Sequence, residues 1–147
     1  MKSIRDDGEH TPDTPRPLSL ATPLNGDTFC IAHARRLAAD FLTRAQTEKN
    51  VTVSERAVDL TQLVVSELVT NAHRHAPGPI RMELRITGPM VEVTVQDSTR
   101  IRPIPRSADP KRIGQHGLEI VKAVASHFHV CLQPSGKRVS ARVPLTA

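Results

Sequence analysis

The stretch SELVTNAHRHAPGPI, residues 66–80, decides how this chain of 147 residues is interpreted. Residues 66–75 of this stretch are the second half of a segment in which apolar side chains recur every three to four residues. This is the period of one face of a buried helix. The segment begins near Ser54, a good N-cap residue, and stops before the helix breakers Pro77 and Pro79. We therefore expect a well-buried helix over about residues 54–75. Its apolar stripe consists of Ala57, Leu60, Val64, Leu68 and Ala72, widened by Val65 and Val69.

Two polar residues lie at the edge of this stripe. Glu67 and Asn71 are four residues apart, so they point the same way from adjacent turns, and His75 continues their row. Carboxylate and amide oxygens can hold a hydrated Mg²⁺, and a glutamate can act as a general base towards a hydroxyl or water. From the spacing alone, an ordinary solvated pair is the better interpretation.

The segments on either side of this helix predict the fold class. Helical periods and strand alternation are grouped along the chain rather than strictly alternating. This order predicts an α+β fold, a two-layer sandwich with a mixed, mostly antiparallel sheet and helices on one face. The expected elements are an edge strand at 17–21, a helix from Asp27 or Thr28 to about Gln46, the helix at 54–75, a hairpin at 80–97, a helix opening at 114–117 and a hairpin with strands at 128–132 and 138–143.

Two segments do not fit a packed layer. Residues 1–16 are polar and hold two prolines, so we expect a flexible tail before a single domain over residues 17–147. Residues 98–113 have no useful period and contain three prolines and four arginines. A loop of this length inside a compact domain is typical of a functional lid.

Two further features are weak alone. Asp97 ends an alternating strand, where its carboxylate can accept a hydrogen bond from an exocyclic amine or simply start a turn. Gly114 and Gly117 open the third helix. Backbone N–H groups at a helix start attract phosphate, and glycine permits close approach, although such glycines also serve ordinary loop-to-helix junctions.

Together, in this order and spacing, the three features resemble the conserved boxes of the Bergerat-type ATPases, the superfamily of gyrase, heat-shock chaperone, histidine-kinase and mismatch-repair ATPases. The string at residues 66–76 matches SELVTNAxxHA, the usual form in the small bacterial anti-sigma-factor serine/threonine kinases of actinobacterial type. The later string GLEIVKAVASHF, residues 117–128, is similar to the helix that follows the glycine-rich box of that family. The resemblance spans about residues 18–145.

The resemblance implies ATP and Mg²⁺ as cofactors and a role for each matched position. Glu67 would be the general base and Asn71 the Mg²⁺ ligand, while Asp97 would contact the adenine amine. Residues 98–113 would form the ATP lid. The remaining nucleotide-binding positions would be Gly114, Gly117, the backbone N–H of Leu118 and, near the phosphates, His75.

The resemblance also implies partners. The family forms homodimers that bind a sigma factor or phosphorylate a serine or threonine of an antagonist protein. This sequence departs from the wider superfamily in two places: Ser-Thr-Arg without glycine follows Asp97, and Gln115 and His116 separate the two glycines of the later box. A non-catalytic module that sequesters a partner through a degenerate nucleotide site is therefore the alternative function.

Composition bounds the remaining choices. The net charge is +5, but the arginines are scattered, and aromatic residues make up 2% of the chain. Sequence-tolerant single-strand binding uses aromatic stacking platforms, so we expect a solvated basic surface or an acidic protein partner rather than direct nucleic-acid binding. The two cysteines form no disulfide framework, and neither a signal peptide nor an apolar membrane span is apparent, so a cytoplasmic protein is expected.

A metal site is one further alternative. His127, His129 and Cys131 would share one face of a strand because side chains alternate, and imidazole and thiolate suit Zn²⁺. Such a site needs a fourth ligand from elsewhere. An ordinary solvent-facing side opposite Phe128 and Val130 is the stronger interpretation.

Overall fold

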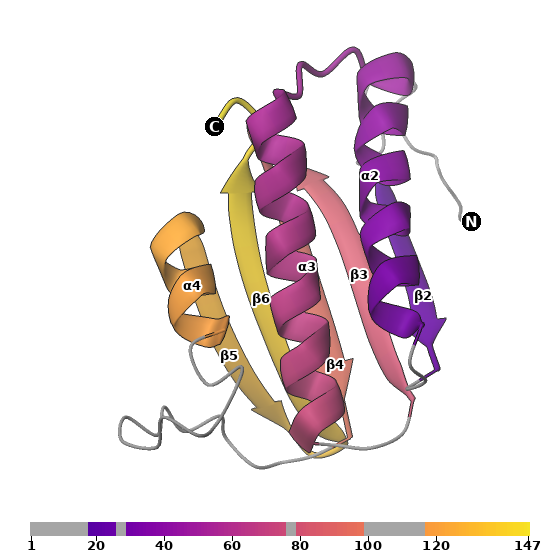
Figure 1. Ribbon diagram of the computed structural model, residues 1–147, viewed down its shortest axis with the longest axis vertical. Coiled ribbons are helices and arrows are strands. Elements are labelled where there is room, and N and C mark those ends of the chain that lie inside the picture. Colours follow the sequence, from indigo (N-terminus) through magenta and orange to yellow (C-terminus); the bar gives the residue numbers. More distant parts are fainter. Residues whose placement is uncertain (1–17, 26–28, 76–78, 99–116) are drawn as a thin grey trace, which may run out of the picture.

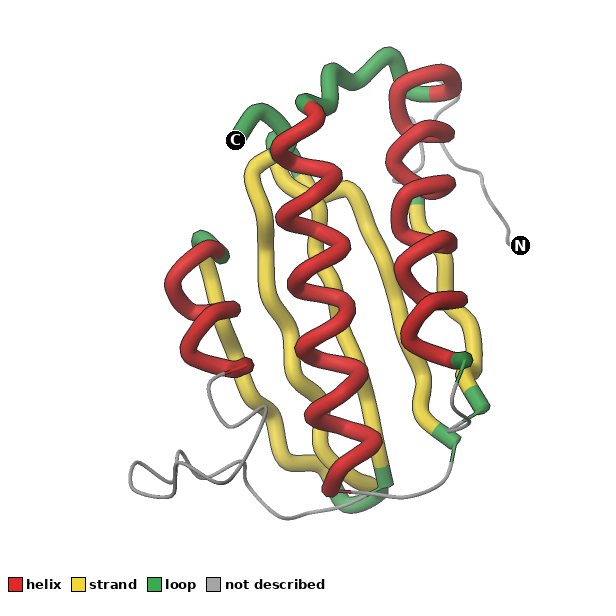
Figure 2. Tube along the Cα trace, in the orientation of Figure 1, coloured by secondary structure: helices red, strands yellow, loops and turns green. Residues whose placement is uncertain are grey.

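The described part of the chain forms two layers, a five-stranded sheet with three helices on one side of it (Figure 1). The computed structural model describes residues 18–25, 29–75, 79–98 and 117–147, and for His75 it describes the backbone alone. Figure 2 shows the helices together in front of the strands. The elements are β2 (Ser19–Leu24), α2 (Cys30–Glu48), α3 (Glu55–His75), β3 (Ile80–Thr87), β4 (Met90–Asp97), α4 (Gly117–Val124), β5 (His127–Gln133) and β6 (Gly136–Pro144).

The sheet order is β2-β3-β4-β6-β5. Each of the four pairings between these strands is antiparallel, so the parallel component of a mixed sheet is not seen in the described strands. The register places Leu84 beside Val93 and Val93 beside Ala141, which lines up the apolar positions of three strands. The predicted α+β two-layer sandwich with helices on one face is confirmed.

Side-chain alternation divides the sheet into a covered and an uncovered face. The covered, or inner, face meets α2 over β2 and β3, α3 over the central strands and α4 over β5. Because the chain has few aromatic residues, aliphatic side chains fill this layer almost alone, with Phe41 as the one buried ring among the described residues. Its buried apolar strand residues include Met82, Leu84, Val91, Val93, Val95, Ala141 and Val143.

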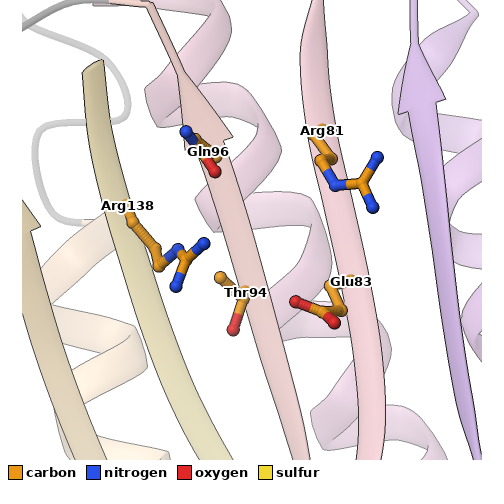
Figure 3. Close-up of a pocket in the computed structure, with 5 residues that line it drawn as sticks. All are labelled: Arg81, Glu83, Thr94, Gln96 and Arg138. Atoms are coloured by element: carbon orange, nitrogen blue, oxygen red, sulfur yellow. The ribbon is translucent and has the colours of Figure 1, made fainter. Parts of the chain in front are cut away.

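The uncovered, or outer, face is polar and partly neutralised by pairing across the strands. Glu92 lies between two arginines, accepting from the Arg85 guanidinium at 2.9 Å and from Nε of Arg142 at 3.0 Å. A shallow hollow lies further along this face (Figure 3). It is lined by Arg81, Glu83, Thr94, Gln96 and Arg138. Part of the basic charge of the chain thus lies on a sheet face that water can solvate.

The helix boundaries follow local signals closely. Ser54 caps α3 as predicted, because its hydroxyl accepts a hydrogen bond from the backbone N–H of Ala57 at 3.0 Å. The same hydroxyl donates to the carbonyl of Ala147 at 2.9 Å and so ties the chain end to the start of α3. Helix α2 begins at Cys30, after Phe29, which provides no side-chain cap; the suggested cap at Asp27 or Thr28 falls outside the described residues.

Two predicted strands have shifted boundaries, and the predicted start of the third helix is only partly described. The edge strand at 17–21 is observed as β2, Ser19–Leu24, and includes Pro23, which an edge strand tolerates because one side of it has no ladder. The strand expected at 138–143 begins two residues earlier, at Gly136. The third helix begins at Gly117, and residues 114–116 are not described. None of the described helices has the length and apolar character needed to cross a membrane.

We expect Ser54→Ala to lower the free energy of unfolding by about 1 kcal/mol, since a capping hydroxyl is lost at the start of the central helix. Urea denaturation followed by circular dichroism measures the change. Ser54→Thr keeps the hydroxyl and serves as the control. If the alanine and threonine variants unfold at the same urea concentration, the cap contributes nothing to stability.

Candidate functional site

Helix α3 presents its two polar residues at the border of the core. Glu67 and Asn71 are both half-buried, and each is followed by a residue that is almost completely buried, Leu68 and Ala72 respectively. The buried stripe fixes the rotation of the helix about its axis. The position of the two polar side chains is therefore determined by packing and not by a loop.

The start of α4 lies directly against Glu67. Gly117 is buried, and a Cβ atom built on it would overlap with Oε1 of Glu67. Fifty residues of sequence separate the two, and α3 packs on α4. The backbone N–H groups in the first turn of a helix have no partner within the helix, so this end of α4 presents donors beside a carboxylate.

Asn71 offers an amide with unused hydrogen-bonding capacity. Its Nδ2 atom is buried and makes no hydrogen bond to any described residue. The carboxylate of Glu67 stands one turn before it on the same side of α3. Carboxylate and amide oxygens are hard donors of the kind that Mg²⁺ takes, so the donor set of this pair fits a magnesium ion.

Asp97 ends β4 and points into the inner layer, where it is 4% exposed. Two residues of the neighbouring strand surround it. A Cβ atom on Gly136, whose φ is +153°, would overlap with the backbone carbonyl of Asp97. Lys137 is its partner in the sheet register, and the ammonium Nζ lies 3.5 Å from Oδ2 of Asp97. The start of β6 therefore lies against Asp97 through the backbone at Gly136 and through the ammonium of Lys137.

Lys137 is the residue that sequence reasoning missed. It shares the side of β6 that carries Val139, Ala141 and Val143, and is 1% exposed. The strand pattern contained the signal. Lys137 lies two positions before Val139, and alternate residues of a strand point to the same face, so Lys137 shares the apolar face. It was overlooked because Lys137 was placed in the turn before the strand.

These elements meet at one end of the sandwich. The C-terminal half of α3, the last residues of β4 and the first residues of α4 and β6 lie at the lower end in Figure 1. Leu118 is the second residue of α4, and its side chain packs against the core, which leaves its backbone N–H as the group that can face a ligand. Gly114, the side chain of His75 and all of the expected lid at 98–113 except Ser98 lie outside the described residues.

The suggested zinc ligands do share one side of β5. His127 and His129 are exposed and Cys131 is half-buried, opposite the partly buried Phe128 and Val130. Over the described ranges, no group of three or more histidine, cysteine or acidic residues is placed to hold a metal ion.

Comparison with known proteins gives a family match. Residues 30–143 match the family model described as the histidine kinase-like ATPase domain. No match was found among curated protein sequences.

Solved structures give a match of fold. The RsbU and RsbW domains of Rv1364c from Mycobacterium tuberculosis superpose with a TM-score of 0.64 at 18% identity, over 90% of this chain and 32% of that one. The chain therefore spans about a third of the length of that two-domain chain. A histidine kinase domain from Erythrobacter litoralis gives a TM-score of 0.44 at 23% identity, covering 74% and 61% of the two chains. The blue-light-activated histidine kinase of that organism gives 0.49 at 20%, covering 79% and 45%.

Alanine substitutions at the two glycines of the site are expected to differ in how much they change stability. Gly136→Ala places a Cβ against backbone at a φ that L-residues avoid, so we expect the free energy of unfolding to fall by about 1–3 kcal/mol. In Gly117→Ala the overlapping atom ends a flexible side chain that can rotate away, so the change stays below about 1 kcal/mol. Urea denaturation of both variants measures the difference. Equal destabilisation would contradict the contacts described here.

Proposed function

Because the chain belongs to the histidine kinase-like ATPase domain family, we propose that it is an ATP-binding regulatory protein of the anti-sigma-factor type, a kinase that phosphorylates a serine or threonine of an antagonist protein. The family assignment makes it an ATP-binding domain; the kinase activity and the partners are the proposal. The observation that carries it is the position of the Glu67 carboxylate, half-buried against the start of α4. That contact brings a candidate base beside the backbone donors that would meet the phosphates.

Each residue of the site has a chemical task in this proposal. Glu67 accepts the proton of the attacking hydroxyl, the new P–O bond forms at the γ-phosphate, and ADP leaves with the electrons of the broken bond. The first-turn N–H groups at Gly117 and Leu118 donate to phosphate oxygens. Mg²⁺, held by Asn71, supplies neutralisation of the phosphate charge when it is bound. Asp97 accepts from the adenine amine, and Gly114 and His75 complete the set near the phosphates.

The proposed partners are a sigma factor and the antagonist protein, bound by a homodimer of this chain. The second candidate function is a module that sequesters its partner without catalysis. The sequence after Asp97 favours it. Ser98, Thr99 and Arg100 follow Asp97, whereas many related sites have glycines in the residues after this aspartate. The two functions differ in whether phosphate is transferred, not in whether a partner binds.

Calorimetric titration with ATP, with and without Mg²⁺, tests the nucleotide site. We expect magnesium-dependent binding by the wild-type chain and a loss of about tenfold or more in Asn71→Ala, because one ligand oxygen is removed. Gln62→Ala is the control, since this residue lies on the same helix but bonds the carbonyl of Arg35 on α2. The absence of binding at millimolar ATP by a folded wild-type chain would reject the site.

Labelled ATP tests the kinase. The immobilised chain is incubated with a cytosolic extract, and phosphate transfer to captured proteins is measured for wild type and Glu67→Gln. We expect transfer to fall about 10²- to 10⁴-fold, the usual contribution of a general base, while ATP affinity and the captured proteins stay the same. Glu83→Gln, on the outer face, is the control. Equal transfer by wild type and Glu67→Gln rejects Glu67 as the base, and a wild type that captures proteins but transfers nothing supports the sequestering module.

A further inference from the structure

Lys137 is a buried cation whose ammonium donors have no hydrogen-bond acceptor among the described residues. Its side chain is 1% exposed, and its Nζ atom makes no hydrogen bond to any described residue. An ammonium group has three N–H donors, and burying unsatisfied donors costs free energy. The carboxylate of Asp97 lies 3.5 Å away, and its side chain is also 1% exposed.

This pair does not have the geometry of an ion pair that is complete in itself. Hydrogen bonds between an ammonium and a carboxylate are usually about 2.7–2.9 Å long. At 3.5 Å the ammonium is close enough to neutralise Asp97 but remains able to donate to another acceptor. Replacing such a pair by apolar residues is often neutral or stabilising, so stability alone is a weak reason for its presence.

The strand register sets where the pair points. Asp97 and Lys137 are direct partners across β4 and β6. Both occupy the alternating positions that elsewhere on these strands are filled by buried residues such as Val95 and Val139. They therefore project into the inner layer beneath α3, which packs on both strands. This helix also carries Asn71, whose Nδ2 has no hydrogen-bond partner among the described residues.

We propose that Lys137 contacts the nucleotide base and, with Asp97, selects adenine. This inference rests on the proposed function. The amino group of adenine is a donor flanked on each side by a ring nitrogen that is an acceptor. Asp97 accepts from the amine, and the Lys137 ammonium donates to one of the neighbouring ring nitrogens. A carboxylate and an ammonium 3.5 Å apart present the matching acceptor and donor side by side.

The contact also gives specificity. A purine with a carbonyl in place of the amine directs lone pairs at Asp97, and an adenine that lacks the ring nitrogen leaves the buried ammonium without its acceptor. Sites built to hydrogen-bond a ligand group discriminate strongly against analogues without it, because their own buried polar groups stay unpaired. Lys137 is therefore a specificity-determining residue of this site.

The test combines ligand and protein changes. Calorimetry with Mg²⁺ compares ATP with 1-deaza-ATP and 7-deaza-ATP, in each of which one ring nitrogen is replaced by CH, on wild type and Lys137→Met. We expect wild type to bind one analogue about 10- to 100-fold more weakly than ATP, as for the loss of a hydrogen bond to a charged group. Lys137→Met should bind ATP more weakly by a similar factor and should no longer distinguish that analogue from ATP.

The controls keep the outcomes separate. Lys49→Met removes a charge after the C-terminal end of α2 and should leave all three affinities unchanged. The wild-type titrations require no variant, so they can overturn the contact even if Lys137→Met fails to fold. Equal wild-type affinity for ATP and both analogues, or unchanged discrimination in a folded Lys137→Met, overturns the contact while the ATP site stands. A folded wild-type chain that binds no ATP rejects the proposed site and this inference together.

Discussion

The packing of α3 on the inner face of the sheet is the constraint on which the rest of this structure depends. Val64, Val65 and Leu68 are almost completely buried there, and burial of each such side chain stabilises the fold by about 1.5–3 kcal/mol. Any rotation of α3 that moved Glu67 would lift this stripe off the strands. The helix therefore fixes Glu67 and Asn71 at the border of the core, and α4 meets that border through a glycine that leaves room for the carboxylate.

The same inner face ends in charge rather than in another apolar pair. The alternation that buries Val95 and Val139 continues by one step on β4 and β6 and brings Asp97 and Lys137 into the layer. Two charges at the end of an apolar layer are costly, since their desolvation offsets much of their attraction. Gly136 permits this arrangement, because any side chain at that position would collide with the backbone of Asp97. The start of β6 thus accommodates both the backbone and the side chain of Asp97.

Local patterns in the sequence predicted the layers and half of the site. The period of α3, its cap at Ser54 and the position of Asp97 at a strand end follow from neighbouring residues, and the structure confirms these positions. Long-range contacts could not be predicted in the same way. The approach of Gly117 to Glu67 joins residues far apart in sequence, and the partner of Asp97 depends on which strand pairs with β4. Lys137 was missed because a lysine beside a turn is normally solvated.

The contrast between the two faces of the sheet shows why the inner pair, and not the charged cluster around Glu92 on the outer face, belongs to the candidate site. On the outer face, Glu92 is shared by two arginines at 2.9 and 3.0 Å, and all three side chains keep contact with water. Such charges are satisfied without a ligand, and exposed pairs contribute only about 0–1 kcal/mol. On the inner face, the ammonium of Lys137 has neither water contact nor a hydrogen-bond acceptor among the described residues. A ligand acceptor that bonds this ammonium therefore contributes more binding free energy than one that bonds the Glu92 cluster, because the fold has already removed water from the ammonium.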